Sequence, residues 1–73
     1  MTAQLRASLE ALGLQVVADR HNIGWWSVVN RRQVAMFRCA GGEFVYGWCE
    51  TPTGRVDVDT ALELLGAIRV VIG

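Results

Sequence analysis

WWSVVNRRQVAMFRCAGGEFVYGWCE, residues 25–50, is the stretch that decides the fold. Its aromatic and β-branched residues predict three strands, over residues 25–30, 34–40 and 43–50. Gly41-Gly42 is a strong two-residue hairpin signal, and the polar segment 30–33 predicts the other hairpin tip, with Asn30 in a left-handed conformation. The stretch therefore predicts an antiparallel meander.

A helix is predicted before the meander, over residues 2–12. Thr2 is a good N-cap, and Leu5, Leu9 and Leu12 form one apolar stripe. Gly13 stands where a helix end favours a positive φ. Residues 14–20 are rich in β-formers at their centre and predict an incomplete further strand, followed by a turn over 21–24.

A second helix is predicted after the meander. The segment 51–54, which contains a proline and a glycine, is expected to end the sheet. Asp57 and Asp59 are candidate N-caps of the helix. Its apolar stripe consists of Ala61, Leu62, Leu65 and Ile68.

The expected fold is therefore α+β in a single domain, residues 1–73. Its order is helix, antiparallel three- to four-stranded meander, helix (α-β-β-β-β-α). Two helices and one sheet bury their apolar surfaces best when both helices pack on the same sheet face.

A two-residue loop at Gly41-Gly42 fixes which side chains share a sheet face. It pairs Cys39 with Phe44, Phe37 with Tyr46 and Ala35 with Trp48. One face is then uncharged and is expected to form the core: Trp26, Val28, Ala35, Phe37, Cys39, Phe44, Tyr46 and Trp48. The other face carries Trp25, Ser27, Val29, Val34, Met36, Arg38, Glu43, Val45, Gly47 and Cys49. An odd-length loop would move Phe44, Tyr46 and Trp48 to this second face.

The second face is more apolar than a solvated sheet face usually is. The chain is 52% hydrophobic, more than 73 residues can readily hide from water. We therefore expect a non-enzymatic protein-interaction module that uses this face to bind a second copy or a larger protein; the other interpretation is a half-solvated face. The candidate interface residues are Trp25, Val29, Val34, Met36, Arg38 and Val45. Trp25 and Arg38 are also expected to make a cation–π contact.

Nucleic-acid binding is the first alternative, with Arg31, Arg32 and Arg38 on phosphates and Trp25 as a stacking platform. The net charge of zero and the absence of lysine argue against a broad basic surface. The helix–sheet–helix order resembles the double-stranded-RNA-binding fold. The resemblance implies a lysine-rich start to the last helix, whereas this chain has the acidic segment 57–60 there.

A small hydrolase or nuclease that uses His21 with Asp19 is the weaker alternative, because no nucleophile motif accompanies this pair. Cys39 and Cys49 lack zinc-type spacing and are expected on opposite sheet faces, as free thiols. The acidic group at the start of the second helix is explained by the helix dipole; it comprises Asp57, Asp59 and Glu63, with Glu50 before it. We therefore expect no catalytic, metal or cofactor site.

Residue usage bears on location and origin. Two cysteines are too few for a disulfide-stabilised miniprotein, and no apolar run is long enough for a membrane span. A cytoplasmic protein without a membrane partner is therefore expected. All seven basic residues are arginine, which together with abundant Ala, Val and Gly predicts a high-G+C genome, actinobacterial or phage-like.

Overall fold

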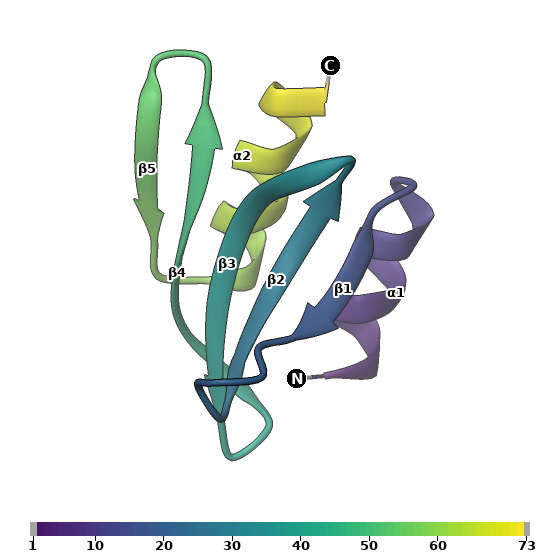
Figure 1. Cartoon of the computed structure of the whole chain (residues 1–73), viewed down its shortest axis with the longest axis vertical. Coiled ribbons are helices and arrows are strands. Elements are labelled where there is room, and N and C mark those ends of the chain that lie inside the picture. The colour runs from purple at the N-terminus through teal and green to yellow at the C-terminus, as the bar shows by residue number, and fades with distance from the viewer. Residues whose placement is uncertain (1, 73) are drawn as a thin grey trace.

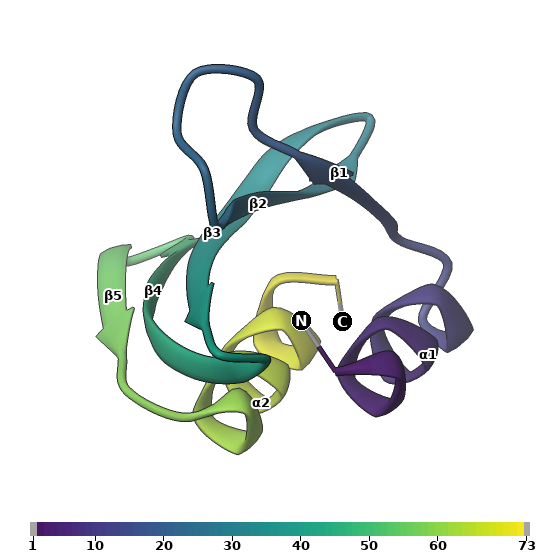
Figure 2. The ribbon, with the colours of Figure 1, turned by 90° about the horizontal axis from the view of Figure 1, so that it is seen from below.

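The structure, a computed structural model, describes residues 2–72. The elements are α1 (Ala3–Ala11), β1 (Gln15–Ala18), β2 (Trp25–Asn30), β3 (Arg32–Ala40), β4 (Glu43–Thr51), β5 (Gly54–Val58) and α2 (Ala61–Ile72). The strands form one antiparallel sheet in the order β1-β2-β3-β4-β5 (Figure 1). The sheet curves around the two helices, which lie on the same side of it (Figure 2). The predicted α+β class and helix–meander–helix order are confirmed, with five strands instead of three to four.

The fifth strand, β5, was missed by the prediction that the sheet ends after residue 50. Thr51 pairs with Gly54, so Pro52 and Thr53 form the loop of another hairpin. The Thr51 hydroxyl donates to the Gly54 carbonyl at 2.6 Å and accepts from the Thr53 N–H at 3.3 Å. Proline suits the first position of such a loop, where no ladder hydrogen bond is needed. It therefore turns the chain back into the sheet.

The ends of α1 follow the sequence prediction. The Thr2 Oγ1 accepts from the Leu5 N–H at 3.2 Å, which caps the first turn. Gly13 has φ +82°, and the Leu14 N–H donates to the Leu9 carbonyl at 3.3 Å. This pattern is a Schellman motif, which satisfies the carbonyl groups left open at a helix end.

The start of α2 differs from the prediction, because Thr60 is the cap. Its hydroxyl accepts from the Glu63 N–H at 3.1 Å, and the Glu63 carboxylate accepts from the Asp59 N–H at 3.0 Å. Asp57 lies in β5, three residues before the cap. The prediction that Asp57 or Asp59 caps α2 with its side chain is therefore wrong.

Two β-bulges decide which residues face the helices. In β4, Tyr46 pairs with Arg38 and Phe44 with Cys39, so Val45 is an extra residue. In β3, Val34 is the extra residue, since Ala35 pairs with Val28 and Gln33 with Val29. Beyond an extra residue, each side chain of the strand points to the opposite sheet face from the one that a regular register gives it.

The bulges correct several predicted positions. Tyr46 and Trp48 leave the core face, whereas Gly47 and Cys49 join it, paired with Phe37 and Ala35. Cys39 and Cys49 therefore share the inner face, contrary to the prediction, and both are buried and free.

The hairpin tip and the helices differ in smaller ways. The left-handed residue at the β2–β3 tip is Arg31, with φ +66°, instead of Asn30. Within residues 2–72, neither helix combines the length and apolar character of a membrane span.

The core lies between the inner sheet face and the helices. Two rows of paired residues supply the sheet side: Trp26, Phe37, Gly47 and Val58 in one, and Val16, Val28, Ala35 and Cys49 in the next. The helices add Leu9, Leu64 and Ile68, each fully buried. All charged residues stay outside this core.

Candidate functional site

The face of the sheet turned away from both helices is the candidate site, and we call it the outer face (Figure 2). Cross-strand pairing arranges its side chains in three rows. The first row holds Trp25, Arg38 and Tyr46. The second holds Val17, Ser27, Met36, Trp48 and Asp57. The third holds Gln15, Val29 and Gln33 on β1 to β3 and the pair Glu50–Arg55 on β4 and β5; the exposed pair Ala40–Glu43 lies beyond the first row, next to the β3–β4 turn.

Three aromatic rings, which we call the aromatic cluster, lie together on the outer face. The Trp25 ring centre is 5.4 Å from that of Trp48 and 6.3 Å from that of Tyr46, with Tyr46 edge-on at 85°. The Tyr46 and Trp48 ring centres are 6.4 Å apart. All three side chains are half-buried. Edge-to-face and tilted contacts of this kind contribute about 0.5–1.5 kcal/mol each beyond area burial, so the rings fix one another.

The missed strand β5 supplies the polar groups that hold the aromatic cluster. The Tyr46 hydroxyl donates to Asp57 Oδ1 at 2.9 Å, and Arg55 Nε lies 3.6 Å from the same oxygen. The Arg55 guanidinium carbon is 4.0 Å from the Trp48 ring centre, a cation–π contact. Asp57 thus connects Tyr46 to Arg55, and through it to Trp48.

The predicted interface residues reach different places. Trp25, Met36 and Arg38 lie together on the outer face, and Val29 lies in its third row. Val45 is the bulge residue of β4 and is exposed. Val34 is only 3% exposed and belongs to the core, because the bulge in β3 turns it inward. Its place in the predicted interface is therefore wrong.

Tyr46 and Trp48 are the site residues that the leading sequence interpretation missed. Their assignment depended on the register of the β3–β4 hairpin. An odd-length loop would have moved both side chains to the outer face, and a bulge in β4 has the same effect. Trp25 and Arg38 are on one face, as predicted, and are paired across strands. Within residues 2–72, however, the cation–π contacts are those of Arg55 with Trp48 and of Arg6 with Trp26. The predicted Trp25–Arg38 contact is therefore not formed.

The arginines proposed for phosphate binding do not gather at one site. Arg31 and Arg32 are exposed at the β2–β3 tip, whereas Arg38 lies six residues further along β3 beside Trp25. Six residues of strand span about 20 Å. Trp25 and the hairpin tip therefore do not form one basic platform.

The loop that contains His21 is ordered by Asp19. The Asp19 carboxylate accepts from the His21 backbone N–H at 2.8 Å and from the Asn22 side-chain amide at 3.3 Å. These two hydrogen bonds lower the pKa of Asp19, because they favour its charged form. Asp19 thus binds the main chain of His21, and its role in this geometry is to shape the turn.

The predicted acidic group is divided between two places. Asp57 and Glu50 lie on the outer face, while Asp59 and Glu63 lie at the start of α2. Across residues 2–72, no three or more His, Cys, Asp or Glu side chains come together in a way that would hold a metal ion.

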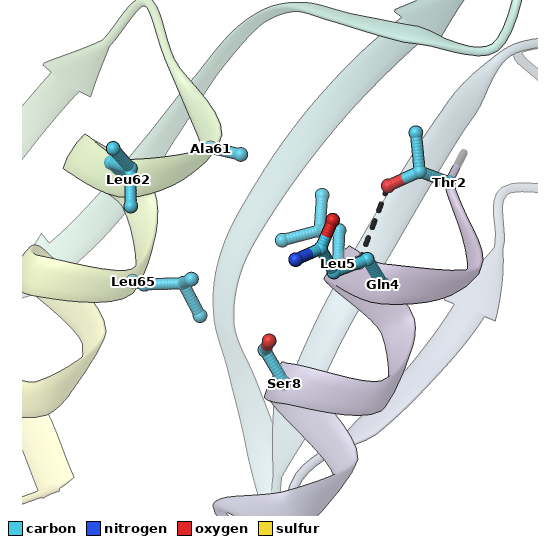
Figure 3. Close-up of a pocket in the computed structure, with 7 residues that line it drawn as sticks. All are labelled: Thr2, Gln4, Leu5, Ser8, Ala61, Leu62 and Leu65. Carbon is cyan, nitrogen blue, oxygen red and sulfur yellow. Dashed lines mark hydrogen bonds between the residues drawn. The ribbon is translucent and has the colours of Figure 1, made fainter.

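A groove of about 330 Å³ lies on the other side of the molecule, between α1 and the start of α2 (Figure 3). Its lining is Thr2, Gln4, Leu5, Ser8, Ala61, Leu62 and Leu65. Leu62 is 81% exposed at this groove. The groove is mainly apolar, and its lining contains no charged side chain.

The two thiols permit a direct test of the bulged register, which buries Cys49 completely. Burial, and secondarily the nearby charge of Glu50, raises the pKa of Cys49. We expect a thiol-disulfide reagent to modify Cys49 in the folded protein on the order of a hundredfold more slowly than free cysteine. Mass spectrometry of quenched samples measures the rate, and both thiols should react quickly in denaturant. Rapid labelling of Cys49 in the folded chain would contradict the register.

Comparison with protein-family models, with curated proteins and with solved structures finds no match for this chain.

Proposed function

We propose that this chain is a small non-enzymatic protein-interaction module that binds its partner through the outer face. The observation that carries this proposal is the half-buried aromatic cluster, which lies on a sheet face that neither helix covers. Trp, Tyr and Arg dominate the binding energy of protein interfaces, and Met is also enriched there. Trp25, Tyr46, Trp48, Met36 and Arg38 bring all four residue types together.

Pre-organisation supports the same function. The rings are held by one another and by Asp57 and Arg55, so a partner does not have to order them. Binding side chains that are already fixed lose less entropy when the complex forms. Both cysteines are free and buried, which suits the reducing cytoplasm expected for this module.

The charges of the outer face favour a protein over a nucleic acid. Glu50 and Asp57 balance Arg38 and Arg55 within the three rows. Phosphates would be repelled by the two carboxylates, and the guanidinium of Arg55 already occupies one site over Trp48 that a base would need for stacking.

Photo-crosslinking in cells of the native host tests this proposal. The variant Val17→p-benzoylphenylalanine places the crosslinker on the outer face, where Val17 is 51% exposed. The matched control is Leu62→p-benzoylphenylalanine, at an 81% exposed position on α2. We expect protein adducts from position 17, absent from the control and lost when Met36→Glu is added. The adducted protein, once purified, should bind the unmodified chain and fail to bind the Met36→Glu variant.

The products distinguish the candidate functions. Protein adducts that depend on Met36 support the module. Adducts with nucleic acid alone would favour the alternative function, and no adducts at position 17 would overturn the proposal.

A further inference from the structure

We infer that the partner of the outer face is a second copy of this chain, an inference that rests on the proposed function above. The three rows carry two basic and two acidic side chains: Arg38, Arg55, Glu50 and Asp57. Three rows with balanced charges do not repel their own image. This is a condition for a two-fold contact in which both copies use the same surface.

Two of these four charges are already engaged, and two are open. Asp57 and Arg55 contact each other; in addition, Asp57 accepts a hydrogen bond from Tyr46, and Arg55 lies over the Trp48 ring. Arg38 and Glu50 are exposed, and the ion pairs within residues 2–72 include neither. The open charges are opposite in sign, so each is a suitable partner for the other on a second copy.

The positions of Arg38 and Glu50 fit such a contact. Arg38 lies in the first row and Glu50 in the third, with Met36 and Trp48 in the row between them. A two-fold axis that runs along this middle row places the first row of one copy over the third row of the other. Arg38 then lies over Gln33 of the second copy, and Glu50 of that copy is one strand to the side, about 4.8 Å away and within reach of the long arginine side chain; this contact occurs twice. Met36 and Trp48 pack against their own counterparts at the centre, where apolar burial contributes most.

The size of the outer face sets the expected affinity. Five strands about 4.8 Å apart and three rows about 6.6 Å apart give a patch at the low end of specific interfaces. We therefore expect a reversible dimer with a dissociation constant of about 10–500 µM.

Charge reversal, measured by sedimentation equilibrium between about 10 µM and 1 mM, tests the contact. The wild type should approach twice the mass of the 8.0 kDa chain. Arg38→Glu and Glu50→Arg should each weaken the dimer about tenfold, because each brings like charges together. The double variant restores opposite charges and should recover the wild-type constant to within about threefold. Arg69→Glu, the same charge change at an exposed position of α2, should have no effect on the dimer.

Circular dichroism of each variant checks that the fold is intact, and Glu50→Gln replaces Glu50→Arg if the latter fails to fold. A wild type that remains at 8.0 kDa at the highest concentration would overturn the inference. A double variant as weak as the single variants would also overturn it. If the wild type is monomeric and position 17 still crosslinks a different protein, the second-copy inference falls and the proposed function stands. If position 17 gives no adducts at all, both fall.

Discussion

Gly47→Ala should lower the free energy of unfolding by about 3 kcal/mol, a large part of the stability of a small domain. A Cβ on Gly47 would lie 2.6 Å from the Met36 carbonyl oxygen and 2.8 Å from Phe37 Cβ. Both atoms belong to the neighbouring strand β3, in which Phe37 is paired with Gly47. No side-chain rotation relieves these contacts, so the sheet backbone must move.

Gly66→Ala is the matched control for Gly47→Ala. Gly66 lies within α2, and a Cβ there would meet nothing within 4 Å. Alanine should therefore raise the free energy of unfolding by about 0.5–1 kcal/mol, because it restricts the unfolded chain and favours the helix. Urea denaturation followed by circular dichroism measures both variants. Similar losses in the two would show that Gly47 is not specially constrained.

Phe37→Ala should destabilise the chain by about 3–5 kcal/mol, enough to unfold much of it at 25 °C. Phe37 is fully buried at the centre of the sheet, and its ring centre is 5.6 Å from that of Phe44. Removing the ring loses its transfer free energy and leaves a cavity in the core.

Trp48→Ala should cost less, about 1–2 kcal/mol, although tryptophan is the larger side chain. Trp48 is half-buried on the outer face and loses its contacts with Trp25, Tyr46 and Arg55 without leaving a cavity in the core. Thermal unfolding of the two variants side by side measures the difference. The reverse order would mean that Trp48 lies inside, as the unbulged register predicts.

The sequence predicted the helices and the central strands because these depend on local signals. The leucine stripe, the Thr2 cap and Gly13 specify α1, and the double glycine specifies the β3–β4 turn. The Pro52 turn was misread because proline both ends strands and begins hairpin loops. Only the pairing of Thr51 with Gly54 distinguishes the two cases, and this pairing depends on the folded structure instead of the local sequence.

The sequence predicted that the sheet has an apolar outer face, but it did not predict all the residues that lie on it. Trp25, Met36 and Arg38 could be placed because the register between β2 and β3 around them is regular. Tyr46 and Trp48 could not, since one extra residue at position 45 reverses them. No turn residue marks that bulge, and valine is an ordinary strand residue there. The two halves of the aromatic cluster therefore look unrelated in the sequence.

Because β5 is at the edge of the sheet, its local unfolding affects the fraction of time for which the aromatic cluster is held in place. β5 pairs with β4 alone, yet it carries Asp57 and Arg55, which hold Tyr46 and cover Trp48. Edge strands open by local unfolding more readily than central ones. Each such opening would release the Tyr46 hydroxyl and uncover the Trp48 ring while the core stayed folded. The cluster would then alternate between a fixed and a loosened form, with fraying of one short strand setting the ratio.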